Sequence, residues 1–215
     1  MIVAGLWYGL AALRPTGYDR VPSPSTTASA AAQLAQSGEL LREAWTSLRR
    51  VTIGWTLAML AGTLLGLLAG TFAVGYYTAI PFNSFLRYVP PTAFVTLLIV
   101  YFGIDESYKY AVVFAGLFFF VVQMVVDAIE DIDRRYVELA LTSGFESRHV
   151  FAYVVVPAIM PRLVDIARIN LSAAWTFVVV AEVVGAETGL GHLLAVSQRF
   201  NRVENLYAGI LMFGV

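Results

Sequence analysis

Long uncharged segments separate short charged ones along this chain. The longest has 36 residues and lies between Arg50 and Arg87. An α-helix needs only about 20 apolar residues to cross a hydrocarbon core about 30 Å thick. We therefore predict one complete membrane span over residues 51–74, followed by tyrosines of the kind that end spans at the membrane interface.

Three shorter segments and the two chain ends extend this pattern. Residues 88–104 and 110–126 are uncharged over 17 positions each, and residues 169–181 are uncharged over 13. Residues 1–14 and 206–215 hold apolar segments too short to cross a bilayer, so we predict incomplete first and last spans. The pattern predicts an all-α, polytopic transmembrane helical bundle with about five to six spans.

Two polar segments interrupt the apolar ones. We predict that residues 15–50 form an extracytoplasmic segment with an amphipathic helix at 28–50. We predict that residues 51–215 form the transmembrane core. Within that core, residues 127–150 are densely charged and must lie in water. The distribution of Lys and Arg leans towards placing this loop outside the cell, so charge alone does not place it in the cytoplasm.

Composition narrows the protein class. Hydrophobic residues make up 59% of the chain and charged residues 13%, whereas a soluble domain has about 25% charged residues. The net charge of −1 argues against nucleic-acid binding, which needs a clustered excess of Lys and Arg. The chain has no cysteine, its two histidines are far apart, and it has no G-x4-G-K-[ST] loop. We expect it to bind no metal and no cofactor.

One polar segment carries a specific motif. Glu138, Ala140 and Gly144 lie in register with Pro157. This arrangement resembles the EAA signature of permease subunits of bacterial ABC importers, E-A-A-x3-G-x9-I-x-L-P. Leucine replaces the first alanine, and valines replace the isoleucine and the leucine. The resemblance implies that these four residues, with Leu141, couple the chain to an ATPase.

The chemistry of the segment suits that role. A short helix ending at Gly144, which accepts positive φ, can turn sharply into a second helix. Glu138 can offer a carboxylate to an arginine of a partner, while Ala140 and Leu141 keep the contact face small and apolar. The alternative is an ordinary amphipathic loop helix with a glycine C-cap. The motif and its place between spans disfavour that alternative.

The resemblance extends to residues 47–54, 89–93, 101–104 and 181–191, which are similar to the taurine, sulfonate, nitrate and bicarbonate branch of the same permease family. It implies a MetI-like fold with six spans, the 127–150 loop in the cytoplasm, and a multi-pass protein of the bacterial cytoplasmic (inner) membrane. The implied partners are a second permease copy in a homodimer, a dimer of ABC ATPase subunits, an extracytoplasmic substrate-binding protein and membrane lipid. ATP hydrolysis would then belong to the ATPase, and the cargo would be a small anion.

Small residues recur at every fourth position of the first complete span. They are Gly54, Ala58, Gly62, Gly66 and Gly70. Residues four apart lie on the same side of a helix, so this stripe predicts the close approach of a second helix. We favour another helix of the same chain over the same helix in a second copy.

Two sets of residues are candidates for the translocation path. Pro90 and Pro91 must start or kink a helix, and either line the path or only open the helix. The candidate outer gate follows the 169–181 span and comprises Glu182, Gly185, Glu187, Gly189 and Gly191. Carboxylates this close to a membrane usually face water or a cavity. The alternative is an interfacial carboxylate that touches no substrate.

Three charged residues, Arg162, Asp165 and Arg168, recur at helical spacing before the 169–181 span. We expect them to pair with one another, with a role for Arg168 in an anion path as the alternative.

Other functional classes fit the sequence less well. A secondary transporter driven by an ion gradient would need carboxylates in the middle of its spans, and the three longest uncharged segments contain none. A membrane enzyme would need a catalytic constellation, which two distant histidines and no cysteine do not provide. A non-catalytic scaffold is the remaining alternative.

Overall fold

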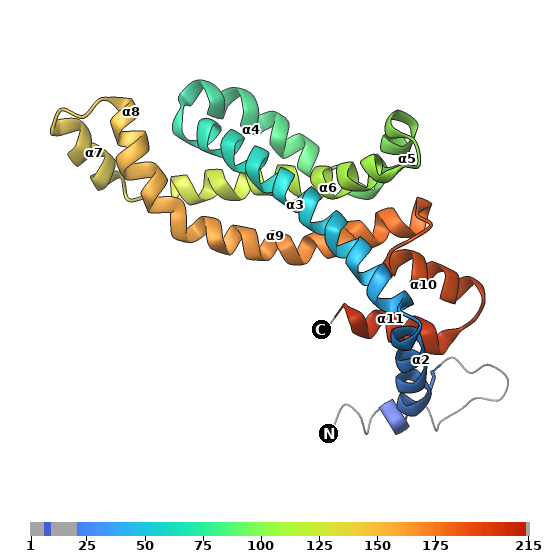
Figure 1. Ribbon diagram of the computed structural model, residues 1–215. Helices are drawn as coiled ribbons and strands as arrows, with labels where there is room; N and C mark the ends of the chain where they lie inside the picture. The colour runs from blue at the N-terminus through green and yellow to red at the C-terminus, as the bar shows by residue number, and fades with distance from the viewer. Residues whose placement is uncertain (1–6, 10–20, 214–215) are drawn as a thin grey trace. The chain divides into compact units, whose positions relative to one another are not determined.

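A computed structural model describes residues 7–9 and 21–213, and the regular secondary structure of these residues is helical (Figure 1). The predicted partial span at 1–14 lies mostly outside the described residues. The elements are α2 (Pro24–Gln36), α3 (Glu39–Thr71), α4 (Ala73–Arg87), α5 (Pro91–Phe102), α6 (Glu106–Glu130), α7 (Arg134–Thr142), α8 (Ser147–Val150), the π-helical turn η1 (Phe151–Val155), α9 (Val156–Gly185), α10 (Leu190–Arg199) and α11 (Val203–Met212).

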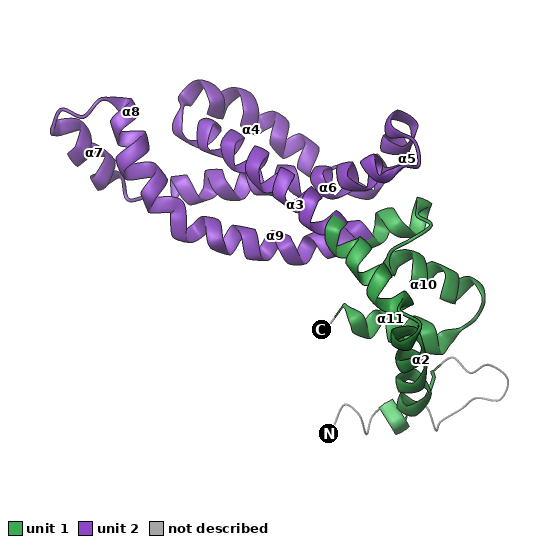
Figure 2. Cartoon of the chain, in the orientation of Figure 1, with its two compact units in different colours: residues 1–49, 179–215 green, residues 50–178 purple. Residues whose placement is uncertain are grey.

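The chain divides into two compact units (Figure 2). Unit 1 contains residues 1–49 and 179–215, and unit 2 contains residues 50–178. Helices α3 and α9 each contribute to both units, because the boundaries at Arg50 and Val179 fall inside them.

In unit 2 the glycines of α3 lie against α6. A Cβ added at Gly54, Gly62 or Gly66 would lie 2.6 to 2.8 Å from the Cβ of Val113, Val121 or Val125, respectively. Such distances leave no room for a methyl group, so glycine permits this approach. The contacts advance in step along both helices, which therefore run in the same direction. The partner of the small-residue stripe is thus a helix of the same chain.

Helix α9 packs against α6 in the opposite direction. Gly116 meets the ring of Phe177, Asn170 Nδ2 lies 3.4 Å from the Met124 sulfur, and Arg162 pairs with Asp131. Between these contacts lies a buried apolar cluster of Val121, Val125, Ala128, Ile159 and Ile166. The C-terminal end of α6 and the N-terminal end of α9 therefore lie at the same end of the pair, where α7 and α8 connect them.

Among the described residues, three helical segments are long and apolar enough to cross a membrane: Glu39–Thr71, Glu106–Glu130 and Ser147–Gly185. Helices α4 and α5 qualify only as a pair, and the pair is bent by 97°. The predicted single span at 88–104 is therefore wrong. Helix α5 has 12 residues, which cover about 18 Å at 1.5 Å per residue.

The bend between α4 and α5 coincides with the two prolines. Pro90 is the N-cap of α5 and Pro91 opens the helix, a position where the missing N–H is not needed. A second turn precedes α4, because Phe72 has an extended backbone with φ −106° and ψ 127°. The uncharged segment at 51–86, predicted as one span with its interface, therefore contains the larger part of α3 and nearly all of a second helix, α4. Within unit 2, Asn83 fixes α4 to α6 by donating to the Phe119 carbonyl over 3.1 Å.

In unit 1, helix α2 packs on α11. The predicted amphipathic helix at 28–50 is wrong as a continuous element, because Gly38 with φ +74° separates α2 from α3. The second half of that prediction is the start of α3, which continues into the membrane-spanning length.

Candidate functional site

The predicted helix-turn-helix is present as α7 and α8, and we call residues 134–150 the exposed hairpin. Gly144 has φ +85°, as the sequence predicted. Its N–H donates to the Leu141 carbonyl over 3.0 Å, and the Phe145 N–H donates to the Ala140 carbonyl over 3.1 Å. These two bonds form a Schellman motif, which ends a helix by means of a residue in the left-handed region.

None of the nine residues of α7 is buried. Leu139 is 66% exposed, and Leu141, Phe145 and Tyr136 also expose large apolar or aromatic surfaces. Exposed apolar side chains leave the hairpin with surface that a protein partner can cover. Ala140 is half-buried.

Glu138 lies on an exposed side of α7 and borders a cavity of about 530 Å³. The cavity lies between the hairpin and the ends of the long helices, and its lining includes Gly70, Ile129, Glu130 and Val155.

The start of α7 is fixed by a charged cap. The carboxylate of Asp133 accepts from the Arg135 N–H over 3.0 Å, and the Arg135 guanidinium donates to the same carboxylate at 2.6 to 3.1 Å. The hydrogen bond from the Arg135 guanidinium lowers the pKa of Asp133 below its ordinary value. Asp133 therefore stays ionised well into the acidic range and continues to cap α7.

Pro157 lies where the hairpin joins the long helix. It is the second residue of α9, and only Val156 separates it from the π-helical turn η1. A proline inside an α-helix has no N–H for the carbonyl four residues earlier and its ring collides with that carbonyl. A π-helical turn widens the helix at this point and is a known site of helix bending. Pro157 thus lies at the junction of the hairpin with α9, where the π-helical turn spares the helix a collision with the proline ring.

The candidate gate residues lie in unit 1 and form a second polar site. The N–H groups of three consecutive residues, Gly189, Leu190 and Gly191, donate to the side chains of Glu43, Ser47 and Glu182, respectively. Ser47 Oγ also donates to Glu182 Oε1 over 2.7 Å. We call this set of contacts the α10 clamp.

The clamp corrects the expectation for Glu182. Its side chain is 1% exposed and accepts hydrogen bonds from backbone and hydroxyl donors, so it does not face water. Gly191 allows this contact, because a Cβ there would lie 2.8 Å from Glu182 Cβ. Of the other candidates, Glu187 is exposed and Gly185 is half-buried.

Sequence reasoning missed Glu43 and Ser47, because they fall in the segment assigned to an extracytoplasmic amphipathic helix. The sequence does contain a signal for them, because the two polar residues are four positions apart and thus share a face of α3. Both are buried in the structure. A polar pair within one turn, just before a span, is the pattern that could have revealed them.

A charge cluster in unit 2 with two buried cations, Arg50 and Lys109, was also missed. The guanidinium of Arg50 is fully buried and donates to Glu106 over 2.5 and 2.9 Å, and Lys109 Nζ lies 2.8 Å from the same carboxylate. Buried charges persist only when they are paired and hydrogen-bonded. This cluster joins the first turn of α6 to the N-terminal half of the parallel helix α3, away from the end of α6 that leads into the exposed hairpin.

The predicted pairing of Arg162, Asp165 and Arg168 is partly wrong. Arg168 pairs with Asp165 over 3.3 Å, whereas Arg162 reaches Asp131 across the α6–α9 contact over 3.0 Å. All four side chains are exposed, so each pair contributes little to stability.

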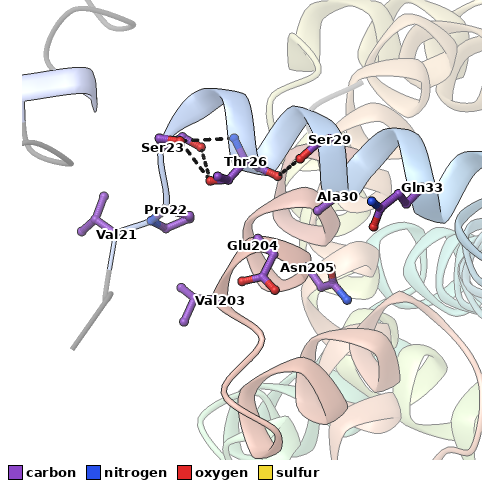
Figure 3. A pocket seen from close by; sticks show the side chains of 10 residues that line it. All are labelled: Val21, Pro22, Ser23, Thr26, Ser29, Ala30, Gln33, Val203, Glu204 and Asn205. Carbon is purple, nitrogen blue, oxygen red and sulfur yellow. Dashed lines mark hydrogen bonds between the residues drawn. The ribbon is translucent and has the colours of Figure 1, made fainter. Parts of the chain in front are cut away.

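Figure 3 shows a cavity of about 340 Å³ in unit 1, between the N-terminal ends of α2 and α11. Glu204 and Asn205 of α11 border it opposite Ser23 and Thr26 of α2. The Ser23 hydroxyl caps α2 by accepting from the Thr26 N–H over 3.2 Å. The polar lining of the cavity thus includes a side chain that already serves helix capping.

Comparisons with known proteins agree on one family. Residues 59–215 match the model of the binding-protein-dependent transport system inner membrane component. A probable ABC transporter permease protein of Brucella melitensis is 32% identical over 211 residues, which cover 98% of this chain and 85% of that protein. A putative aliphatic sulfonates transport permease protein of Bacillus subtilis is 29% identical over 214 residues, covering 100% of this chain and 78% of that protein.

A solved structure agrees on the fold. The MetNI methionine ABC transporter, in inward-facing conformations, contains a chain that superposes with a TM-score of 0.72. The match covers 83% of this chain and 89% of that chain at 18% sequence identity. The all-α, MetI-like fold is therefore confirmed.

Proposed function

Because the chain belongs to the family of binding-protein-dependent transport system inner membrane components, we propose that separate ATPase subunits drive its import of a small anion. The chain itself is an ABC importer permease, a transporter rather than a catalytic enzyme. The anion is a sulfonate, nitrate or bicarbonate. The sulfonate named for the Bacillus subtilis relative supports this choice.

The observation that carries the coupling proposal is the exposed hairpin. It presents Leu139, Leu141 and Phe145 to solvent at the end of the α6–α9 pair. A soluble partner that covers these side chains removes apolar surface from water. Glu138 adds an exposed carboxylate that can receive a guanidinium. The ATPase binds at this surface.

The packing of α6 and α9 explains how binding there moves the spans. The hairpin links the adjacent ends of two helices that share a buried apolar cluster. A force on the hairpin therefore displaces both helices together, because packed cores move as rigid bodies rather than deform continuously. Closure of two ATPase subunits thus rotates the spans and exchanges outward for inward access.

The assembly has two permease copies, two ATPase subunits and a substrate-binding protein on the outer face. It lies in the cytoplasmic membrane of a bacterium, with the hairpin in the cytoplasm. The apolar surface of α3 supports a lipid environment, since Leu57, Leu60 and Leu64 of this predicted span are exposed in the isolated chain.

Retention of the ATPase tests the docking surface. Leu141→Asp places a charge in the contact, and we expect the amount of ATPase that copurifies with the permease to fall at least tenfold. Phe200→Asp is the matched control, because Phe200 is also a large exposed apolar residue but lies between α10 and α11. Equal retention of the ATPase by the two variants would contradict docking at the hairpin.

A further inference from the structure

We propose that residues 39–49 of α3 lie in the outer interface of the bilayer, where Leu41, Trp45 and Leu48 contact lipid. We call these three residues the outer stripe. The pattern of uncharged segments places residues 39–49 in water instead, ahead of a span that begins at residue 51. The choice of the outer leaflet rests on the proposed function, whereas the contact with lipid follows from the side chains of α3 themselves.

The first turns of α3 direct polar side chains towards the protein. Glu43 is 4% exposed, and Ser47 is fully buried. Both accept hydrogen bonds from backbone N–H groups in the α10 clamp. Residues four positions apart share one side of a helix, so the inner side of this segment is polar.

The outer stripe lies on the opposite side of the helix. Leu41 is 71% exposed, Trp45 is 67% exposed and Leu48 is 42% exposed. An α-helix completes a turn in 3.6 residues, so two positions correspond to a rotation of about 200°. Trp45 is two positions from both Glu43 and Ser47, and its side chain therefore points away from theirs. The exposed side of this segment is thus apolar.

This distribution is the reverse of that in a helix bordered by water. A helix on the surface of a soluble protein turns its apolar side to the core and its polar side to the solvent. In a membrane the reverse holds, because polar side chains are costly in hydrocarbon and face the interior of the protein. Residues 39–49 therefore have the pattern of a helix whose surroundings are apolar.

The length of α3 agrees with this placement. A bilayer is about 30 Å thick in its hydrocarbon core and about 40–45 Å thick with both interfaces. Exposed apolar side chains continue along α3 from the outer stripe to Leu68. At 1.5 Å per residue, the distance from Leu41 to Leu68 along the helix is about 40 Å. The exposed apolar side of α3 thus matches the whole bilayer rather than its hydrocarbon core alone.

Trp45 falls at the level that suits an indole. Each interface is about 5–8 Å deep, and Trp45 is about 6 Å further along α3 than Leu41. Tryptophan is enriched where headgroups meet acyl chains, because its ring is apolar and its N–H donates a hydrogen bond. The exposed Arg42 and Arg49 fit the same level, since long basic side chains extend to the headgroups.

The size of the side chains favours lipid over a second helix as the occupant. Helices that pack on one another in a membrane do so through small residues, and α3 itself meets α6 through Gly54, Gly62 and Gly66. The outer stripe consists of leucine and tryptophan. Acyl chains adapt to side chains of this size, so lipid covers the stripe.

Spin labelling of the assembled complex in lipid nanodiscs tests the placement. Trp45→Cys introduces a single thiol into this cysteine-free chain, and the attached nitroxide reports collisions with oxygen, which concentrates in lipid, and with a water-soluble nickel chelate. Leu60→Cys is the reference in lipid, because Leu60 is also 67% exposed, and Ser37→Cys is the reference in water. We expect the ratio of oxygen to nickel collisions at position 45 to exceed that at position 37 at least fivefold.

Two outcomes would overturn the inference. Equal ratios at positions 45 and 37 would place the stripe in water. Low collision rates with both reagents at position 45 would show that a protein, either a partner or a second copy of this chain, covers it. Absence of ATP-driven transport by the complex would count against the proposed function alone, since the spin label needs no transport.

A second readout avoids the label. Trp45→Phe keeps an apolar ring at an exposed position, so it leaves the packing of α3 intact. In nanodiscs of lipid brominated near the headgroup, we expect the tryptophan fluorescence of the wild type to be quenched by a larger fraction than that of Trp45→Phe. Equal fractions would contradict the contact of Trp45 with lipid.

Discussion

Two glycines of this chain, in different parts of the fold, both have a positive φ that other residues rarely adopt. Gly144 has φ +85° and Gly38 has φ +74°, and no atom lies within 4 Å of a Cβ added at either position. A side chain at either site therefore meets backbone strain but no collision. The left-handed region costs an L-residue about 1–2 kcal/mol. Gly144 ends α7 beside the exposed hairpin surface, whereas Gly38 separates α2 from α3, so the two sites form a matched pair.

We predict that Gly144→Val disrupts coupling, because a β-branched residue strongly disfavours φ +85° and the Schellman bonds of α7 are lost. A penalty of about 1–2 kcal/mol corresponds to a 5- to 30-fold loss of the competent hairpin. ATP-driven uptake should fall by that factor while the permease still inserts. The control Gly38→Val carries the same strain, and equal uptake by the two variants would refute the special role of Gly144.

The contact of α3 with α6 shows how a sequence pattern becomes helix packing. Four glycines of α3 face Val113, Val121, Val125 and Ile129 of α6. A helix has 3.6 residues per turn, so each step of four residues advances about 40° around its axis. The stripe therefore winds around α3, and α6 follows it. The glycines differ in what surrounds them, which makes their substitution informative.

We predict that Gly66→Ala destabilises the protein more than Gly70→Ala. At Gly66 an added Cβ lies 2.7 Å from Val125 Cβ and 3.0 Å from the Val122 carbonyl oxygen, whereas at Gly70 its closest neighbour is the terminal Cδ1 of Ile129 at 2.8 Å. The Ile129 methyl can rotate away, but the backbone cannot. Overpacking at Gly66 should cost about 1–3 kcal/mol.

Thermal unfolding of the purified permease measures this difference. The double substitution Gly70→Ala with Ile129→Val provides a control, because it removes Cδ1 and leaves the next contact at an ordinary 3.4 Å. It should unfold within 1–2 °C of Ile129→Val alone, an estimate from about 2–4 °C per kcal/mol for a chain of this size. An equal loss of stability for Gly66→Ala and Gly70→Ala would contradict the packing described.

Local motifs were predictable from the sequence, and the course of the uncharged segments was not. The positive φ of Gly144 and the close approach at the small-residue stripe follow from residue chemistry. The counting of uncharged residues, by contrast, does not detect a turn at Phe72 or a 97° bend before Pro91, because neither needs a charge. Likewise, the hydrogen bonds of Glu43 and Ser47 join residues more than 140 positions apart, beyond the reach of any local pattern.

At the scale of the whole molecule, the direction of the chain through the membrane is the property that charge left unsettled. The exposed hairpin follows the C-terminal end of α6, whereas the ion pair of Arg50 with Glu106 joins the N-terminal half of α3 to the opposite end of α6. Because α3 and α6 run in the same direction, the hairpin and this cluster lie on opposite sides of the bilayer. The proposed docking of the ATPase places the hairpin in the cytoplasm and the cluster outside.

We predict that a cysteine at Ser37 is labelled from outside intact cells and a cysteine at Ser143 is not. Both positions are exposed, and the chain contains no cysteine of its own. The reagent is an impermeant maleimide, and permeabilised cells serve as the control because both positions should react there. Labelling of position 143 but not of position 37 in intact cells would invert the orientation.

The central claim, that this permease converts ATP hydrolysis by a partner into import of a small anion, is tested most directly by transport in a defined system. The measurement is ethanesulfonate uptake into proteoliposomes that contain the permease, its copurifying ATPase and a substrate-binding protein. We predict uptake that requires ATP and the binding protein and that persists when ionophores collapse every ion gradient. Uptake that continues without ATP and stops on addition of the ionophores would contradict the account.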